Sequence, residues 1–381
     1  MTNFSFCNPV RVEFGKDKEK NIGKYMKECD SKKTLVLYGS ERVRKSGLMD
    51  VVEASLKENG IEYVLLGGVK SNPVLSKVNE AIKLAKEFSA DSILAVGGGS
   101  VLDSAKAIAA GACYDGDVWD FFTGKKPVSA LKIFDIITLA ATGSEMNKGG
   151  VVTNEATKQK YSLDAPCLYP KVSVINPALQ ATVTSEYLVY SASDIIAHSI
   201  EAYFTATHHP ELIRMQIEAN IKATIRTTEI LLANPDDYDA RAEFAWAATM
   251  ALNGLTHLGV SGFGFPNHMI EHAISAVTDC AHGAGLSVVM PAWMKWYAPK
   301  NPAAFERFAR EIFGKNTAEE GIEALKAWFD KIGTPTSLSG VGVTDANLEE
   351  VIKVTLMHSK DWGMSDIYTR ESLETIFSLA K

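Results

Sequence analysis

The chain has 381 residues, of which 46% are hydrophobic and 22% charged, a composition typical of a globular protein that is long enough for two domains. Its net charge of −7, with both signs interspersed, argues against nucleic acid as the main partner, because a phosphate-binding surface needs a face rich in lysine and arginine. No apolar run approaches the roughly 18 residues that a membrane-spanning helix needs, so we expect no membrane partner.

The five cysteines indicate a reducing compartment. Their number is odd, they are widely scattered, and no pair has CxxC or zinc-ribbon spacing, so we expect free thiols. The opening residues Met1–Pro9 lack the basic and apolar regions of a signal peptide. We therefore expect a cytoplasmic protein.

In the first half of the chain, compact apolar runs of strand length alternate with helical stretches. The runs are Thr34–Tyr38, Glu62–Leu66, Ser92–Val96 and Phe134–Leu139. One helix is predicted over Val43–Asn59, with Gly60 as its C-cap. Near-continuous apolar strands that alternate with helices predict a Rossmann-like parallel sheet covered by helices on both faces.

The pattern changes in the middle of the chain. Short pieces rich in Gly, Lys and Thr between Thr142 and Ile175 indicate hairpins at the edge of the first domain, and Val172–Ile175 has the character of a strand. Thr184-Ser185-Glu186 then supplies N-cap chemistry, and almost everything to the end has helical periodicity. We predict an α/β domain over residues 1–180 and an all-helical domain over residues 181–381.

A glycine turn follows the third strand of the first domain. The strand Ser92–Val96 runs into Gly97-Gly98-Gly99-Ser100, and a helical stretch follows. Such a turn exposes backbone N–H groups beside the positive end of a helix dipole, where phosphate binds well. The spacing differs from the GxGxxG fingerprint because position 102 is Leu, and a tight strand-to-helix turn without a ligand is the alternative interpretation.

A second polar turn of small residues, Thr138–Glu145, directly follows the next strand. Loops at the carboxyl ends of parallel strands are where an open α/β sheet binds its ligand. Two such loops ahead of a helical domain indicate a dinucleotide-binding domain, with the cofactor in an interdomain cleft.

Metal-binding side chains are concentrated in the helical half. Asp194 and His198 are four residues apart in a predicted helix, Ser185–Thr207, so they leave the same helix face, and His268 and His272 repeat this spacing. A further histidine, His282, opens a His-Gly-Ala-Gly sequence whose glycines let backbone come close to whatever the histidine holds. One carboxylate and three imidazoles from this set are sufficient to bind a divalent transition metal. We expect the cofactor's reactive end to lie near this metal.

Together these motifs resemble the iron-containing (group III) alcohol dehydrogenase family, most closely its butanol-dehydrogenase-like branch. The resemblance runs over essentially the whole chain and includes Gly97–Lys106, Ala141–Asn147, Leu168–Val172, Asp194 with His198, and His268-x3-His272-x9-His282-Gly283. The last two motifs are specific, whereas glycerol dehydrogenases and dehydroquinate synthases share the glycine loop.

The resemblance implies a role for each matching residue. Asp194, His198, His268 and His282 would ligate the metal, and His272 would line the active site near nicotinamide and substrate. The loop Gly97–Ser100 would hold the pyrophosphate. The remaining cofactor contacts would come from Asp103, Thr138, Leu139, Thr142, Ser144 and Lys160, with Asn147 as a further cofactor or pocket residue.

The choice of nicotinamide cofactor depends on the turn after the first strand. This turn is Gly39-Ser40, where relatives that exclude NADP carry an acidic residue, so an uncharged turn leaves room for a 2′-phosphate with Arg42 or Arg44 nearby. Glu41 departs from the glycine-rich pattern of the family and would repel the phosphate if it pointed inward. We predict NADP(H) as the preferred cofactor and NAD(H) as the alternative.

The implied reaction is hydride transfer between nicotinamide and a primary alcohol or aldehyde. One carboxylate and three neutral imidazoles leave a net charge near +1 on a divalent metal, which favours an alkoxide, and His272 would relay the alcohol proton. A metal-dependent hydrolase and a dehydroquinate-synthase-like lyase, each acting on a phosphorylated substrate, are the alternatives. The lyase is weakened because a lysine- and arginine-rich pocket is missing near the metal residues.

The identity of the metal and the oligomeric state are less determined by the sequence. The family name implies iron, yet Zn²⁺ outcompetes Fe²⁺ at most nitrogen and oxygen sites, so Fe²⁺ or Zn²⁺ is expected. Family relatives often dimerise through the N-terminal domain, and the strand-like Val10–Phe14 is a candidate for that contact. We expect a homodimer.

Overall fold

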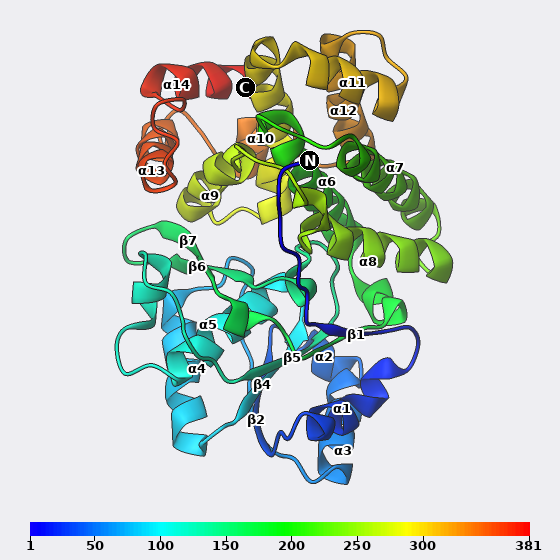
Figure 1. The fold of residues 1–381 in the computed structure, drawn as a ribbon, viewed down its shortest axis with the longest axis vertical. Helices are drawn as coiled ribbons and strands as arrows, with labels where there is room; N and C mark the ends of the chain where they lie inside the picture. Colours follow the sequence, from blue (N-terminus) through cyan, green and yellow to red (C-terminus); the bar gives the residue numbers. More distant parts are fainter. The chain divides into compact units, whose positions relative to one another are not determined.

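A computed structural model describes all 381 residues, which form two compact units (Figure 1). One unit comprises Cys7–Val183, and the other comprises Thr184–Lys381 together with Met1–Phe6. The first six residues therefore belong with the helical unit, whereas the predicted first domain began at residue 1. A backbone hydrogen bond of 3.1 Å from Thr2 N to Gly259 O ties this segment to the helical unit. No helix is both long and apolar enough to cross a membrane.

The α/β unit is built on a six-stranded sheet in which all neighbouring strands are parallel. In spatial order the strands are β1 (Arg11–Phe14), β8 (Val172–Ile175), β5 (Lys132–Ile137), β4 (Ser92–Gly97), β2 (Lys33–Tyr38) and β3 (Glu62–Leu66). The predicted parallel sheet is confirmed. A separate antiparallel hairpin, β6 (Gly149–Asn154) with β7 (Gln159–Asp164), occupies the region where the sequence predicted hairpins.

Helices cover both faces of the sheet because successive strand residues point to opposite sides. Leu35 and Leu37 of β2 pack in one core with α4 (Leu75–Phe88) and α5 (Gly99–Ala112). Val36 and Tyr38 pack in a second core with α1 (Ile22–Glu28) and α3 (Leu48–Glu58). This alternation explains why the strands are almost continuously apolar in sequence.

One predicted helix is broken. The structure divides Val43–Asn59 into α2 (Arg42–Lys45) and α3 (Leu48–Glu58). Between them Gly47 has a φ of 77°, a left-handed conformation that a helix interior does not contain. The prediction of one continuous helix was therefore wrong. It arose because the hydrophobic periodicity of the sequence continues across the break.

The second unit consists of helices. They are α6 (Ser185–Thr205), α7 (Glu211–Ala233), α8 (Tyr238–Leu252), α9 (Pro266–Thr278), α10 (His282–Tyr297), α11 (Pro302–Phe313), α12 (Ala318–Ile332), α13 (Leu348–Asp361) and α14 (Arg370–Leu379). Most of α6 from Leu188 to Phe204 is buried, so this helix forms the centre of the unit. The predicted fold class, an α/β domain followed by a helical domain, is confirmed.

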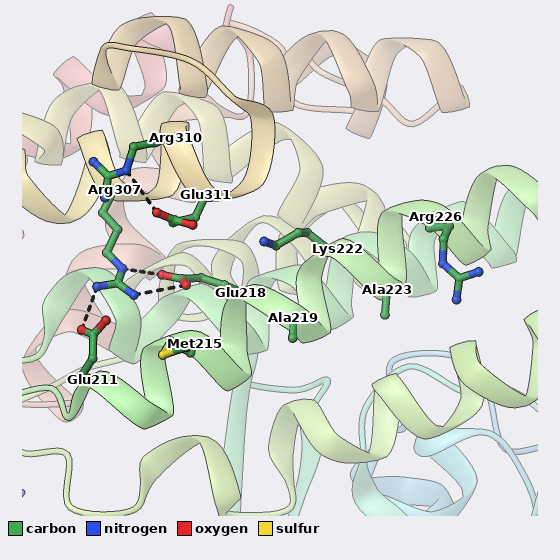
Figure 2. A pocket seen from close by; sticks show the side chains of 10 residues that line it. All are labelled: Glu211, Met215, Glu218, Ala219, Lys222, Ala223, Arg226, Arg307, Arg310 and Glu311. Carbon is green, nitrogen blue, oxygen red and sulfur yellow. Dashed lines mark hydrogen bonds and ion pairs between the residues drawn. The ribbon is translucent and has the colours of Figure 1, made fainter.

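An ion-pair network on the surface of the helical unit joins α11 to α7 (Figure 2). The Arg307 guanidinium donates to Glu218 at 2.5 Å and to Glu211 at 2.7 Å. The Glu218 carboxylate is buried and also accepts a hydrogen bond from Tyr203 at 2.8 Å. The charge of Arg307 is therefore largely neutralised by Glu218 and Glu211.

Candidate active site

Three helices of the second unit bring the predicted metal residues together. α6 carries Asp194 and His198, α9 carries His268, and His282 is the first residue of α10. The ligand atoms gather around Asp194 Oδ1, which lies 3.6 Å from His198 Nδ1, 3.7 Å from His268 Nε2 and 3.6 Å from His282 Nε2. These separations are too long for hydrogen bonds.

The donor atoms fit a divalent metal. In a regular tetrahedron with metal–nitrogen bonds of about 2.1 Å, the ligand atoms lie about 3.4 Å apart, close to the separations found here. Asp194 Oδ1, His198 Nδ1 and His268 Nε2 are buried and have no hydrogen-bond partner. Because an unpaired buried polar atom is costly, three such atoms in one cluster indicate that a ligand completes their coordination.

The four candidate ligands are not equivalent. Asp194, His268 and His282 each offer an atom within 4.8 Å of the others, whereas His198 is not part of that trio. The His198 ring instead stacks on the His268 ring, with centroids 4.6 Å apart and planes at 22°. The side chain of His282 is 24% exposed and that of Asp194 only 4%, so the cluster is most accessible on the His282 side.

Two buried glutamates support the histidines from behind. His268 Nδ1 lies 2.8 Å from Glu201 Oε1, and His282 Nδ1 contacts Glu271 Oε2. Glu201 also accepts a hydrogen bond from the His268 backbone N–H at 2.9 Å. A carboxylate on one ring nitrogen fixes the tautomer that presents the other nitrogen to a metal. Both contacts therefore direct Nε2 towards Asp194.

Electrostatics in the cluster favour an ionised aspartate among histidines. Burial alone raises the pKa of Asp194, but His198, His268 and His282 together lower it below the ordinary value. Burial lowers the pKa of His198 to about 3. For His268, burial is outweighed by Asp194 and Glu201, which raise its pKa to about 9. The two carboxylates therefore attract positive charge to the position of the His268 ring.

The sequence analysis missed both glutamates. Glu201 lies three residues after His198, and Glu271 lies three residues after His268, so helical periodicity places each beside the ligand-bearing face. The signal that reveals them is a carboxylate in an otherwise apolar helix, next to a candidate ligand. Such a residue is almost never fully buried without a partner.

The glycines after His282 are required by the packing around them. A Cβ at Gly283 would lie 2.0 Å from the Tyr190 carbonyl oxygen of α6. A Cβ at Gly285 would lie 2.7 Å from Cγ of Glu271. The glycines therefore let α10 pack against α6 and let Glu271 reach His282.

His272 lies beside the cluster without joining the metal trio. Its side chain is buried, and its ring centroid lies 5.6 Å from that of His282 and 5.4 Å from that of Trp362. Glu271, His272 and His282 form a second group with metal-binding potential. Glu271 is already bonded to Nδ1 of His282. The group of Asp194, His268 and His282 therefore has more donor atoms available for a metal than this second group.

In the α/β unit, the glycine turn begins α5. A Cβ at Gly97 would lie 2.4 Å from the Val101 side chain, and a Cβ at Gly99 would lie 2.4 Å from the Thr142 side chain. Only glycine fits at these two positions without displacing a neighbour. The turn leads into a 14-residue helix, whose first backbone N–H groups, those of Gly99 and Ser100, have no intrahelical acceptor.

The other predicted cofactor residues follow the carboxyl ends of neighbouring strands. Gly39 and Ser40 follow β2, and Thr138 and Leu139 follow β5, because β5 ends at Ile137 rather than at the predicted Leu139. Thr138 N donates to Gly97 O at 2.9 Å, which joins its turn to the glycine turn. These residues therefore lie along one edge of the sheet.

Four further predicted cofactor residues have engaged side chains. Ser144 Oγ donates to Asp103 Oδ1 at 2.7 Å, and Asn147 Nδ2 donates to Gly143 O at 3.0 Å. Lys160 on β7 is buried and donates to Asn72 Oδ1 at 3.0 Å. The sequence analysis gave no role to Lys106, the buried lysine that contacts both Ser144 and Asn147. Burial lowers its pKa to about 8.

Comparison with known proteins places both units in one family. The family model for iron-containing alcohol dehydrogenase matches residues 9–177, and the model for the C-terminal part of the Fe-containing alcohol dehydrogenase family matches residues 188–380.

Individual relatives match over nearly their whole length. A probable NADH-dependent butanol dehydrogenase 1 of Bacillus subtilis (strain 168) is 37% identical over 360 residues, 92% of each chain. An NADPH-dependent aldehyde reductase of Escherichia coli (strain K12) is 31% identical over 363 residues, 93% of this chain and 92% of that protein. The crystal structure of NADH-dependent butanol dehydrogenase A from Thermotoga maritima has a TM-score of 0.96 at 45% identity, covering 100% of this chain and 99% of that one.

Proposed function

Because the chain belongs to the iron-containing alcohol dehydrogenase family, we propose that Asp194, His198, His268 and His282 hold its catalytic metal. The chain is a nicotinamide-linked alcohol dehydrogenase or aldehyde reductase of the butanol-dehydrogenase-like branch, and neither the hydrolase nor the lyase alternative is favoured. The observation that carries the metal proposal is the group of buried, unpartnered polar atoms around Asp194 Oδ1.

A divalent metal held by these residues would supply Lewis-acid polarisation of the oxygen of the alcohol or aldehyde. The residues of the chain prepare the site for that chemistry. Asp194 contributes the one negative charge among the proposed ligands, which would leave a divalent metal with surplus positive charge towards the substrate oxygen. Glu201 and Glu271 hold the His268 and His282 rings in orientation, so little reorganisation is needed when metal and substrate bind.

We propose that His272 moves the hydroxyl proton between substrate and solvent. Its ring lies beside His282, outside the Asp194–His268–His282 trio, and histidine titrates in the range in which a proton relay is efficient. His272→Ala should therefore lower turnover while the bound metal stays stoichiometric by elemental analysis. Loss of the metal in this variant would make His272 a ligand instead.

The edge of the parallel sheet supplies the proposed cofactor contacts. The N–H groups of the turn Gly97-Gly98-Gly99-Ser100 bind the pyrophosphate at the positive end of the α5 dipole. Gly39 and Ser40 lie where the adenosine ribose of a dinucleotide is bound in open α/β sheets, and Thr138, Leu139 and Thr142 line the adjacent turn. Lys160 and Asp103 are retained as neighbouring candidates.

We propose NADP(H) as the preferred cofactor. Gly39 and Ser40 carry no charge, and the Glu41 carboxylate lies 3.6 Å from Arg44 and accepts a hydrogen bond from the Tyr38 hydroxyl at 3.4 Å. Glu41 is therefore partly neutralised, and Arg42 adds a positive charge close by. The names of the B. subtilis and T. maritima relatives contain NADH instead. The test is the ratio of kcat/KM for NADPH to that for NADH: a ratio above one supports NADP(H), and a ratio below one supports NAD(H).

The proposed physiological metal is Fe²⁺, in line with the family's printed name, and Zn²⁺ is the competing occupant. Elemental analysis of protein purified anaerobically without added metal distinguishes the two.

We also propose a cytoplasmic homodimer. β1 is an edge strand paired only with β8, so its outer edge is open to a second copy, and light scattering on the purified protein tests this assembly.

The proposed activity is tested with metal-replete protein, NADPH or NADH, and butanal. Consumption of reduced nicotinamide that depends on the aldehyde supports the proposal. Absence of reduction with every short and medium-chain aldehyde, together with hydrolysis of a phosphoester, would establish the hydrolase alternative instead.

A further inference from the structure

Lys106 is a fully buried lysine on α5 that contacts oxygen atoms from a single loop. Its Nζ lies 2.7 Å from Ser144 O and 2.8 Å from Ser144 Oγ. It also lies 3.0 Å from both Asn147 O and Asn147 Oδ1, and 2.6 Å from Gly149 O. All five oxygens belong to neutral groups, so Lys106 interacts with this loop as a cation among dipoles.

The same helix holds this loop at two more points. Asp103, three residues earlier on the same helix face, accepts from Ser144 Oγ at 2.7 Å and from Val151 N at 3.0 Å. Asn147 then closes the loop on itself, since its Oδ1 accepts from Gly149 N at 2.9 Å. The segment from Ser144 to Val151 is therefore shaped by contacts to α5.

These contacts occupy the side chains that the family resemblance assigns to the cofactor. Ser144 is 2% exposed, and its hydroxyl already donates to Asp103 and accepts from Lys106. The Asn147 amide uses its nitrogen for Gly143 O and its oxygen for Lys106 and Gly149 N. The single Ser144 hydroxyl proton is therefore committed to Asp103, and the Asn147 amide oxygen is committed to Lys106 and Gly149, so both side chains are engaged mainly with α5 and within the loop.

The helix that carries Lys106 also begins at the glycine turn. Gly99, the first residue of α5, packs directly against Thr142, which lies at the start of the loop. One rigid helix therefore connects the turn proposed for the pyrophosphate with the loop proposed for the rest of the cofactor. Loss of the Lys106 contacts is therefore expected to shift the loop relative to the glycine turn.

We infer that Lys106 is a positioning residue for the nicotinamide cofactor, and that Ser144 and Asn147 act together with it by building the loop. This inference rests on the proposed function, because it requires that the α/β unit binds a dinucleotide.

A double-mutant cycle tests the inference on the full-length, metal-replete enzyme. The variants are Lys106→Met, Asn147→Ala and their combination, and the measured quantity is the dissociation constant of NADPH and of NADH from fluorescence titration. Lys106→Met should raise this constant about tenfold or more, since charge-assisted hydrogen bonds that fix the loop are lost. Asn147→Ala should raise it in the wild-type background but change it less than about twofold in the Lys106→Met background, because the two residues act as a unit.

Three further measurements separate positioning from general damage. Metal content should stay at the wild-type value, because the proposed ligands lie in the other unit. Hydrogen exchange of peptides covering residues 142–151 should accelerate in Lys106→Met. The control variant is Lys86→Met. It removes an exposed lysine of the neighbouring helix α4, which donates to the Tyr114 carbonyl oxygen, and it should leave the dissociation constants of NADPH and NADH unchanged.

The outcomes distinguish this inference from the proposed function. Equal effects of Asn147→Ala in both backgrounds would establish a direct cofactor contact and overturn the inference, as would wild-type affinity in Lys106→Met. If Lys106→Met does not fold, faster exchange of residues 142–151 in Asn147→Ala supports the inference, and wild-type exchange there overturns it. A wild-type enzyme that binds no nicotinamide would overturn both the inference and the proposed function.

Discussion

At the scale of single residues, Glu201 and Glu271 contact the ring nitrogens of His268 and His282 that face away from Asp194. Replacing Glu201 with Gln removes a buried negative charge and releases the His268 tautomer. We expect the metal dissociation constant to rise about 10- to 100-fold, measured by competition with a chromogenic chelator. Glu243→Gln, at an exposed ion pair with Arg226, serves as the control and should leave it unchanged. Unaltered metal affinity in Glu201→Gln would show that the carboxylate is only structural.

Asp135 on β5 is a buried carboxyl group whose protonation state follows from its neighbour. Ser173 Oγ lies 2.7 Å from both Asp135 Oδ2 and the Glu145 carbonyl oxygen. One hydroxyl proton serves only one acceptor, so a neutral Asp135 that donates to Ser173 satisfies both contacts. Burial also raises the pKa of Asp135 well above its ordinary value. We infer that Asp135 is neutral in the folded protein at neutral pH.

The protonation of Asp135 predicts a pH-dependent effect of Asp135→Asn. The unfolded wild type loses the proton near pH 4, whereas the folded state keeps it, so wild-type stability falls as the pH rises towards the folded-state pKa. An amide does not titrate, so Asp135→Asn lacks this loss of stability. The free energy of unfolding of the variant minus that of the wild type should therefore increase as the pH rises from 5 to 8. Urea unfolding across this range measures the difference. A difference that is constant with pH would contradict a neutral Asp135.

The residues that sequence analysis identified and those that it missed differ in a simple way. Asp194, His198, His268 and His282 were identified as candidate ligands because their side chains are types that bind metals and the first two share a helical spacing, and the family resemblance selected them ahead of His272. Glu201, Glu271 and Lys106 were missed because a charged residue in a helix is ordinarily expected to be exposed. Only the three-dimensional contacts show that all three are buried and what they hold.

At the scale of elements, the ion pair between α7 and α11 predicts a stability effect. Arg307 pairs with Glu218, whose side chain is 5% exposed. Arg307→Ala leaves that carboxylate buried without its cation, so unfolding should become easier by about 2–4 kcal/mol in urea titrations. The control is Arg226→Ala, which breaks an ion pair whose side chains are 58% and 52% exposed, and it should cost less than about 1 kcal/mol. Equal costs for both variants would contradict the role of burial.

Element boundaries were predictable where composition changes abruptly. The strands of the parallel sheet appeared in the sequence as short apolar runs, and Glu62–Leu66 was predicted with the bounds that β3 has. The break between α2 and α3 was not predicted, because a glycine inside a periodic apolar pattern is compatible with a continuous helix. Gly47 adopts a positive φ there, and that backbone choice depends on packing rather than on the local pattern.

At the scale of the whole molecule, the division into an α/β part and a helical part followed from the change in periodicity, and the family models match the two parts separately. The association of Met1–Phe6 with the helical unit had no sequence signal, because a backbone contact to Gly259 mediates it. The α/β unit provides the proposed dinucleotide turn and the helical unit the proposed metal ligands, so each activity is open to separate measurement.

Asp194→Ala tests the central claim most directly, with metal content, nicotinamide affinity and aldehyde reduction measured on the same preparation. Asp194 is the only carboxylate proposed as a ligand, and the three histidine nitrogens surround its Oδ1. The account predicts loss of the metal and of butanal reduction, with the dissociation constant of the nicotinamide cofactor unchanged. A variant that keeps stoichiometric metal, or that reduces butanal at the wild-type rate without it, would contradict the account.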